Sequence, residues 1–442
     1  MRRVQPVRVG SKELIREINS SLVLGELRGG LVSRTELAKR TGLSLPTVSE
    51  IVAELIGSGV IEERETASSG GGRRPVLLGL RPDAGYVIGI KVTETRVIAV
   101  LTDLNAGIVE RTTVSLVGDD VDTVVEAVAT VVKQLRAGTA ISSPRQAAAP
   151  AAASGGAADR APAPDAAPDA APAALGGVAG GAPAPAPVYG VGVGLAGVID
   201  RATGVVRHAT YADWRDVDLA AELERRIGLP VVVDNDVNTL VANEQWFGAG
   251  RGVSDVAVVS IGRGVGLGMV LDGRLYRGAG GGAGEFGHTK VVADGPLCDC
   301  GGRGCLEALI GEPAILEAAG CDTVEEAAEL ARGGNQGVKD VFDQVGRTLG
   351  TAVGNLVNLL NPKLIVLAGE GTRSSDLFLP GFEDALQHAV FDGLQRELDV
   401  VVDDWDDEAW AQGAAGLFLG ELFQPNLRPD EADRPSLTKR SA

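Results

Sequence analysis

Short apolar stretches alternate with longer segments of helical periodicity throughout the chain beyond residue 85. The strands that this alternation predicts cover residues 86–90, 97–101, 188–195, 231–233, 256–260 and 364–368. Such alternation is typical of α/β architecture, in which helices cover the faces of sheets. The 442-residue chain is also too long for one ordinary domain. We therefore predict a body of two α/β lobes with a separate unit in front of it.

Two segments are too poor in large apolar residues to fold. Residues 137–187 consist almost entirely of Ala, Pro and Gly with scattered Asp, and such a composition buries too little apolar surface to offset the entropy of the chain. We predict a disordered insertion between two elements of one lobe. Residues 424–442 are polar and contain prolines, which predicts a flexible tail.

The charge of the chain is divided unevenly. Residues 1–82 carry 13 Lys and Arg against 9 Asp and Glu, a net of +4, which leaves −22 on the other 360 residues. Because phosphate repels an acidic surface, any contact with DNA should come from the N-terminal end. Neither an apolar run of about 18 residues nor a leader-like apolar stretch behind the N-terminal arginines is present. We expect a cytoplasmic protein without a membrane partner.

Residues 33–52 have the pattern of a helix-turn-helix: a short helix, a turn at Gly42 and a second helix. Ser44 is the expected N-cap of that second helix, and Pro46 falls in its first turn, where a missing N–H costs little. The second helix should bury Val48, Ile51, Val52 and Leu55. The outer face near its N-terminus, which enters the major groove in such motifs, then carries the candidate base-reading residues Thr47, Ser49 and Glu50.

A basic glycine-rich loop follows this motif. A predicted strand begins at the apolar residue Val60. The loop at residues 68–75 follows it and contains Arg73 and Arg74 beside glycines and a proline. This arrangement suits two strands joined by a wing, and arginines in a wing can enter a narrow minor groove. An ordinary three-helix bundle would show the same helices, but it does not account for the basic loop. Glu50 is the discordant residue, since a carboxylate near phosphates is repelled unless it accepts from a cytosine amino group.

Three of the four cysteines lie within eight residues and follow a histidine. His288, Cys298, Cys300 and Cys305 have the spacing H-x9-C-x-C-x4-C. One imidazole and three thiols complete a tetrahedral set, which predicts a structural Zn²⁺ site with no open position. The alternative is that the cysteines are buried as small apolar residues. Cys321 lies outside the pattern, and we expect it to be a buried free thiol.

A polar run ends the predicted strand at residues 231–233. Asn235 and Asp236 sit where a strand runs into a helix, and polar groups at the carboxyl end of a strand face the ligand crevice of an α/β lobe. Taken alone, Asp236 is equally well explained as a helix N-cap.

The most specific motif runs from Gly278 to His288, as Gly-Ala-Gly-Gly-Gly-Ala-Gly-Glu-Phe-Gly-His, and continues through the cysteine cluster to Glu307. It resembles the signature of the ROK family, whose name covers repressors, open reading frames and kinases. The resemblance covers nearly the whole chain except the insertion and the tail. Within the family, the chain resembles the repressor branch most. It implies a winged helix-turn-helix with linker at residues 1–82 and, at residues 83–423, a two-lobed body of the actin- and hexokinase-like, ribonuclease H-like type.

The resemblance also implies a sugar site. Asn235 and Asp236 match the pair that holds sugar hydroxyls in the family's kinases, where the aspartate is the catalytic base. The other matching positions are Gly194, which with Gly192 and Gly197 forms a turn beside the sugar, and Glu285, His288 and Glu307. Carboxylates, amides and imidazoles suit a ligand whose hydroxyls both donate and accept. His288 could join metal and sugar through its two ring nitrogens.

The phosphate-binding part of the resemblance is incomplete. Kinases of this superfamily carry an Asp-x-Gly-x-Thr turn, and the matching residues here are Lys91, Thr93 and Thr95. A lysine cannot help to hold Mg²⁺, and a β-branched side chain obstructs the close backbone approach that glycine permits. The second phosphate loop, residues 260–268, and the nucleotide-side turn, residues 364–371, are better preserved, although Arg263 replaces a small hydroxyl residue.

Taken together, these features predict a sugar-responsive transcriptional regulator of carbohydrate metabolism that does not transfer phosphate. Its expected partners are a double-stranded DNA operator, a sugar or sugar-phosphate effector and further copies of itself as a dimer or tetramer, since such motifs usually read two half-sites. Relief of repression by sugar is the commoner direction. Two alternatives stay open: a DNA-binding protein that still phosphorylates a hexose, and a zinc-stabilised scaffold without a sugar ligand.

Overall fold

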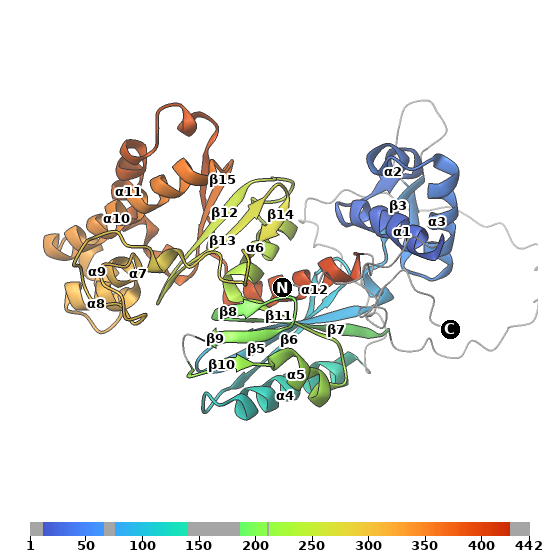
Figure 1. Ribbon diagram of the computed structural model, residues 1–442, viewed down its shortest axis with the longest axis horizontal. Helices are drawn as coiled ribbons and strands as arrows, with labels where there is room; N and C mark the ends of the chain where they lie inside the picture. The colour runs from blue at the N-terminus through green and yellow to red at the C-terminus, as the bar shows by residue number, and fades with distance from the viewer. Residues whose placement is uncertain (1–11, 66–75, 140–185, 210–211, 425–442) are drawn as a thin grey trace, which may run out of the picture.

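The structure is a computed structural model, and it describes residues 12–65, 76–139, 186–209 and 212–424 (Figure 1). The predicted loop with Arg73 and Arg74, most of the predicted insertion and the tail after Gln424 lie outside these residues. Helix α4 (Val121–Thr139) extends three residues into the range assigned to the insertion. The insertion was therefore predicted to begin too early, because its first alanine continues the helix.

The N-terminal unit is a winged helix-turn-helix. Helices α1 (Lys12–Arg28), α2 (Arg34–Thr41) and α3 (Leu45–Gly57) pack with strands β1 (Val32–Ser33), β2 (Ile61–Glu65) and β3 (Val76–Leu80), in the antiparallel order β1-β3-β2. Ser44 caps α3 as predicted, because its hydroxyl accepts from the Thr47 amide at 3.3 Å. The predicted stripe of α3 is buried. The paired strands exclude a bare three-helix bundle.

The first lobe of the body is built on a five-stranded sheet with the order β11-β7-β4-β5-β6. Strands β4 (Tyr86–Val92), β5 (Arg96–Asp103) and β6 (Ile108–Ser115) are antiparallel, and β7 (Val188–Leu195) and β11 (Val231–Asn235) run parallel to β4. Helices α4 and α5 (Leu219–Ile227) cover one face, and α12 (Asp407–Leu422) covers the other (Figure 1). A small sheet of β8 (Gly197–Asp200), β9 (Val205–Ala209) and β10 (Arg215–Val217) follows β7.

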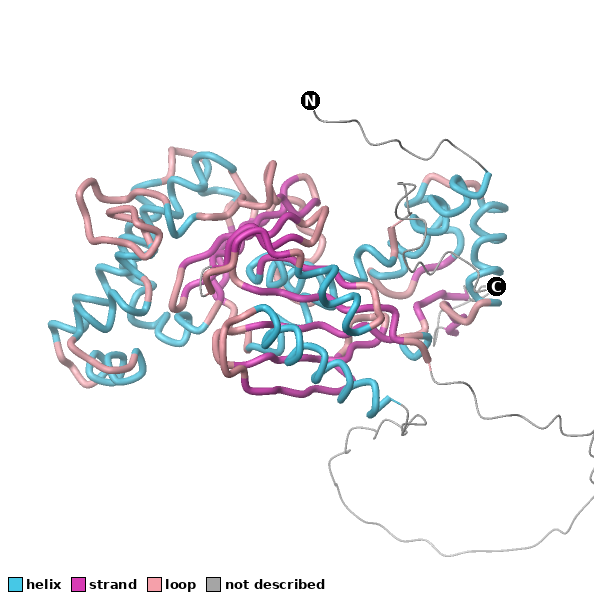
Figure 2. Tube along the Cα trace, turned by 60° about the horizontal axis from the view of Figure 1, so that its bottom comes forward, coloured by secondary structure: helices cyan, strands magenta, loops and turns pink. Residues whose placement is uncertain are grey.

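The second lobe repeats this plan. Its sheet has the order β14-β13-β12-β15-β16 and consists of β12 (Val256–Ile261), β13 (Val265–Leu271), β14 (Arg274–Tyr276), β15 (Leu364–Ala368) and β16 (Asp399–Val402). Its outer helices are α7 (Glu307–Ile310), α8 (Glu312–Ala319), α9 (Val324–Arg332), α10 (Gln336–Leu360) and α11 (Ser375–Ala389). Figure 2 shows the strands of both sheets gathered in the middle of the body, with helices on their outer sides. Among the described residues, no helix is both long and apolar enough to cross a bilayer.

Helices α6 (Asp236–Trp246) and α12 pack against each other and lie between the two sheets. Gly413 of α12 permits this packing, since a Cβ at that position would lie 1.9 Å from the carbonyl oxygen of Thr239. The C-terminal half of α12 also packs on the DNA-binding unit, in a buried cluster that joins Phe418 and Leu419 to Leu24 and Leu27 of α1. A continuous apolar core therefore connects the winged helix-turn-helix to the body.

Candidate functional site

The site is organised by the corner where β11 runs into α6. Asn235 is the N-cap of α6: its Oδ1 accepts from the amides of Val237 and Asn238 at 2.9 and 3.3 Å, and its Nδ2 donates to the carbonyl of Gly197 at 3.0 Å. The interpretation of Asp236 as the N-cap is therefore wrong. Asp236 is the first residue of the helix and lies at the carboxyl end of the sheet.

A buried carboxylate that the sequence did not single out supports this corner. Asp234 is 1 % exposed. It accepts hydrogen bonds from Asn238 Nδ2 at 2.8 Å, from Arg277 Nε at 2.8 Å and from the Asn235 amide at 2.9 Å. Because the guanidinium arrives from a loop 43 residues away, no local pattern could have indicated this role. Asp234 fixes the orientation of the polar residues that follow it.

Three of the predicted sugar-site residues meet opposite Asp236. His288 lies between two carboxylates, with its Nε2 3.9 Å from Glu285 Oε2 and its Nδ1 3.9 Å from Glu307 Oε1. Burial raises the pKa of Glu285, and the charges of Glu307 and Asp236 raise it further. Glu307 is held in place because its Oε2 accepts from the Val265 amide at 3.0 Å. This arrangement offers the donors and acceptors that a polyhydroxyl ligand needs.

His208 of β9 is a further polar group of this region. It lies near enough to Glu285 to oppose the rise in the pKa of that carboxyl group. Its Nδ1 is buried and has no hydrogen-bond partner in the part of the chain that the structure describes. Sequence analysis missed it because a single histidine in a short strand has no distinguishing spacing.

Gly194 lies in β7 beneath α6. A Cβ there would stand 2.7 Å from the Cγ2 of Thr239, and one at Gly192 would stand 1.9 Å from the carbonyl oxygen of Ala414. Both glycines are thus explained by the close approach of helices to the sheet. The role of Gly194 as a sugar contact stays a prediction.

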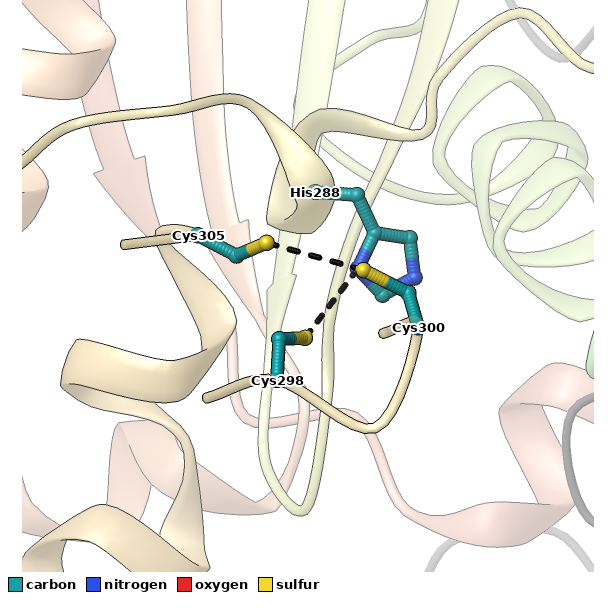
Figure 3. Close-up of side chains that lie close together, drawn as sticks. All are labelled: His288, Cys298, Cys300 and Cys305. Atoms are coloured by element: carbon teal, nitrogen blue, oxygen red, sulfur yellow. Dashed lines mark hydrogen bonds between the residues drawn. The ribbon is translucent and has the colours of Figure 1, made fainter. Parts of the chain in front are cut away.

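The four predicted metal ligands come together, and His288 belongs both to them and to the polar group around Glu285 and Glu307 (Figure 3). Their ligand atoms all lie within 4.8 Å of one another. The sulfur of Cys298 is 3.6 Å from His288 Nδ1, and the sulfurs of Cys300 and Cys305 are 3.6 Å apart. This cluster could hold a metal ion, and Nε2 of the histidine would then remain directed at Glu285.

A lysine accompanies the cluster: the ammonium of Lys290 lies 2.7 Å from the sulfur of Cys305. The fourth cysteine, Cys321, is a free thiol outside the cluster, as predicted, but it is half-buried rather than buried.

The kinase-like turn after β4 holds an ion-pair network. The ammonium of Lys91 is 2.7 Å from Asp407 Oδ1 and 4.1 Å above the ring centre of Trp410, and its side chain is only 11 % exposed. Burial raises the pKa of Asp236, and the charge of Lys91 opposes that rise. In the turn that follows β4, Glu94 pairs with Arg263 of the loop between β12 and β13. The two pairs, Lys91 with Asp407 and Glu94 with Arg263, therefore bring opposite side-chain charges together on this side of the site.

The predicted base-reading residues lie on α3 as expected. The hydroxyl of Thr47 is 2.8 Å from that of Ser44, and the hydroxyl of Ser49 donates to the carbonyl of Leu45 at 2.8 Å. Glu50 is exposed, with its carboxylate 3.6 Å from the guanidinium of Arg16. Arg16 therefore offsets part of the negative charge that would repel Glu50 from DNA phosphates. The roles of these residues in DNA contact remain predictions.

Comparison with family models decides the family. The ROK family model matches residues 178–421, more than half of the chain. The chain belongs to the ROK family. A model described as winged helix-turn-helix DNA-binding matches residues 26–62, which run from the end of α1 through β1, α2 and α3 to the start of β2.

Relatives with names of both branches are similar to this ROK protein. A putative xylose repressor of Caldicellulosiruptor sp. is 29% identical over 94% of this chain and 98% of its own. A glucokinase of Thermotoga maritima is 32% identical, but over 51% of this chain and 78% of its own. The kinase likeness is confined to part of the chain, whereas the repressor likeness includes the DNA-binding unit.

A solved structure has the same arrangement of domains. The crystal structure of a ROK family transcriptional regulator, a homologue of the Escherichia coli MLC protein, covers 93% of this chain and 97% of its own with a TM-score of 0.74 and 23% identity. This match confirms the predicted fold of a winged helix-turn-helix on a two-lobed α/β body.

Proposed function

We propose that this ROK protein is a sugar-responsive, DNA-binding transcriptional regulator, and that sugar relieves repression. Two relatives named putative xylose repressor and xylose repressor match this chain over 98% of their own length. The observation that carries the proposal is that the sugar-binding side of the site keeps its polar residues, whereas the phosphate-binding side does not. The sugar side keeps Asp236, Glu285, His288 and Glu307, whereas the phosphate side holds Lys91 and its ion pairs.

The sugar part of the proposal is tested by ligand-induced stabilisation. A ligand that binds only the folded state raises the melting temperature. We expect one pentose or hexose to do so in the wild type and to lose the effect in Asp236→Asn, which removes an acceptor but keeps the size of the side chain. Glu222→Gln, at a half-exposed position of α5 where the same kind of charge is removed at constant size, is the control. A panel of sugars and sugar phosphates that leaves the wild type unshifted would favour the scaffold without a sugar ligand.

Helix α6 provides the connection from this site to the DNA-binding unit. Its first residue is Asp236, and its last, Trp246, lies under the guanidinium of Arg28, 3.8 Å from the ring centre. Burial lowers the pKa of Arg28 to about 10. The carbonyl of Gly29, at the end of α1, also accepts from Arg251 at 2.8 Å. A sugar that shifts α6 would therefore move α1.

The variant Trp246→Leu tests this connection. It removes the ring beneath Arg28 but lies at the opposite end of α6 from the sugar site. We expect the sugar-induced rise in melting temperature to persist, while the sugar-induced change in DNA affinity falls at least 5-fold, within the usual range of coupling energies of about 1–3 kcal/mol. Unchanged coupling in this variant would contradict a route through α6.

Phosphorylation of a hexose is the second candidate, because the loop at residues 262–268 keeps its glycines and a glucokinase is among the relatives. Phosphoryl transfer depends on metal and on positioned donors around the phosphates. With Lys91 paired to Asp407 in that region, we propose that transfer is lost. Consumption of ATP that requires an added hexose, and that disappears in Asp236→Asn, would establish the kinase instead.

We infer that the metal of the cluster is Zn²⁺ in a structural role. A histidine and three cysteines fit its preferred donors, and three thiolates on a divalent ion leave one negative charge, which Lys290 offsets. When bound, the ion would cross-link the loop that ends at Glu307. We expect Cys300→Ser to lose zinc, as measured by elemental analysis, and to melt at a lower temperature. Cys321→Ser should keep the zinc content and the melting temperature of the wild type. Full zinc content in Cys300→Ser would show that the ligand set is wrong.

A further inference from the structure

His208 of β9 is held against the corner that carries Asn235. Its strand pairs with β8 in the register that sets Gly197 opposite Ala209 and Val198 opposite His208. A Cβ at Gly197 would lie 2.3 Å from the carbonyl oxygen of His208, and the carbonyl of Gly197 accepts from Asn235 Nδ2 at 3.0 Å. The backbone of His208 is therefore fixed relative to Asn235 through one residue of β8.

The side chain of His208 lies on the face of this small sheet that the glycine-rich loop covers. Residues directly opposite each other in paired strands place their side chains on the same face, so His208 shares a face with Val198. The loop packs on that face, because a Cβ at Gly282 would lie 3.7 Å from the Cγ1 of Val198. Glu285 follows this loop. Burial raises the pKa of Glu285, and His208 lies near enough to oppose that rise.

One ring nitrogen of His208 has no partner. Its Nδ1 is buried, and none of the described residues forms a hydrogen bond with it. Leaving a buried polar atom unpaired is costly, and native proteins pair nearly all such atoms. A hydroxyl group suits this nitrogen in either tautomer of the ring, because a hydroxyl both donates and accepts. A phosphate group suits it less, since the carboxyl groups of Glu285, Glu307 and Asp236 act on one another in this region and would repel an anion.

We propose that Nδ1 of His208 binds one hydroxyl group of an uncharged sugar and selects the sugar by the presence of that hydroxyl. This inference rests on the proposed function, since it adds a contact to the site of Asp236, Glu285 and Glu307. A sugar without the hydroxyl would leave the nitrogen unpaired, and a site built to pair a hydroxyl discriminates strongly against analogues that lack it.

Paired changes in the sugar and in the side chain test this contact on the full chain. Isothermal titration first measures D-xylose, D-glucose, N-acetyl-D-glucosamine and glucose 6-phosphate, and then the monodeoxy derivatives of the sugar that binds. One derivative should bind the wild type about 10-fold more weakly than its parent. His208→Phe keeps a ring without nitrogen, so it should bind the parent about 10-fold more weakly than the wild type does and should no longer distinguish the two sugars.

Two further variants separate recognition from structure. His208→Asn should recover part of the preference for the parent sugar, because an asparagine side chain carries a polar atom at the position of Nδ1. His388→Phe is the matched control, since the side chain of His388 is 77% exposed on α11. It should keep the affinity and the preference of the wild type.

NMR of the ring nitrogens provides a measurement on the wild type, which keeps the proposal testable if His208→Phe does not fold. The protein has only three histidines, so the signal that is absent from His208→Asn belongs to His208. That signal should shift when the sugar is added, and the signal of His388 should not.

The outcomes for this contact and for the proposed function differ. Wild-type affinity and wild-type preference in His208→Phe would overturn the contact and leave the proposed function standing. A His208 signal that does not move at saturating sugar would do the same, and would mean that water pairs the nitrogen. Tighter binding of glucose 6-phosphate than of glucose, lost in His208→Phe, would show that the nitrogen takes phosphate instead. If no probe binds the wild type, the proposed function and this contact fail together.

Discussion

Lys91 shows how one side chain can change the chemistry of a site. Its ammonium is held by Asp407 and by the ring of Trp410. The charge of this largely buried ammonium also opposes the rise that burial causes in the pKa of Asp236. Lys91 therefore favours the ionised form of the Asp236 carboxyl group.

The network around Asp407 allows a matched comparison. Lys91 and Arg96 both pair with this carboxylate, but the side chain of Lys91 is 11 % exposed and that of Arg96 is 53 % exposed. Loss of a partner from a buried ion pair leaves an uncompensated charge, so Lys91→Met should lower the free energy of unfolding by about 2 kcal/mol. Arg96→Ala should cost less than about 0.5 kcal/mol. Urea denaturation measures the free energy of unfolding of both variants. Equal losses in Lys91→Met and Arg96→Ala would show that Lys91 does not act through a buried pair.

Glu244 of α6 is a fully buried carboxyl group. Burial raises its pKa to about 7, although Trp405 donates a hydrogen bond to it. Because folding favours the protonated form, its stabilising contribution is complete below the unfolded pKa of about 4.5 and is lost as the pH rises through about 7.

Glu244→Gln should remove this pH dependence. At pH 8 the variant should be more stable than the wild type by about 2 kcal/mol, and at pH 4.5 the two should differ by less than about 0.5 kcal/mol. Glu222→Gln, at a half-exposed position of α5, should show neither effect. Chemical denaturation at both pH values measures this, and a variant that is less stable at pH 8 would contradict the account.

At the scale of elements, the pair α6 and α12 determines how the two lobes meet. Gly413 has no room for a side chain, since its Cβ would lie 1.9 Å from a backbone oxygen of α6. Gly413→Ala should therefore destabilise the protein by about 3 kcal/mol, because the helices must move apart.

Gly420 of the same helix supplies the control. A Cβ there would meet no atom within 4 Å in the described structure, so Gly420→Ala should be neutral or stabilising by up to about 1 kcal/mol through its better helix propensity. Thermal or urea denaturation of both variants measures this difference. A Gly413→Ala protein as stable as the wild type would mean that the two helices pack less closely than described here.

The elements that sequence analysis predicted are those whose pattern is local. All six predicted strands are present, since each is a short apolar run. Strand β6 was not predicted because it is largely exposed and rich in polar residues. Strand β13 was not predicted because two of its seven residues are glycines. The predicted start of the insertion lies three residues before the end of α4, because Ala137 and Gly138 have the composition of the low-complexity segment although they continue the helix.

The candidate site divides in the same way. The metal cluster and the carboxylates could be predicted because their residues belong to one motif between Gly278 and Glu307. Asp234, His208 and the Lys91–Asp407 pair could not, because their partners are brought together only by the fold, across up to 316 residues in the last case. The interpretation of Asp236 as the N-cap of α6 was one residue too late, because the cap is Asn235. The sequence could not separate them, since Asn and Asp are both good N-cap residues.

At the scale of the whole molecule, a continuous apolar core links the DNA-binding unit to a body whose polar site lies at the far end of α6. The opposite charges of the two parts, +4 over residues 1–82 and −22 over the rest, direct DNA toward the winged helix-turn-helix. Paired half-sites would require a second copy of the chain, and we propose that the regulator binds its operator as a dimer or a larger oligomer.

We propose that a sugar bound at the start of α6 controls DNA binding. Fluorescence anisotropy can measure this control on an operator selected from random DNA by the purified protein, with the stabilising sugar titrated in at fixed salt. The sugar should lower the affinity for DNA 5- to 150-fold, corresponding to about 1–3 kcal/mol of coupling, and Asp236→Asn should abolish this loss without changing the affinity in the absence of sugar. An operator affinity that no stabilising sugar alters would contradict it.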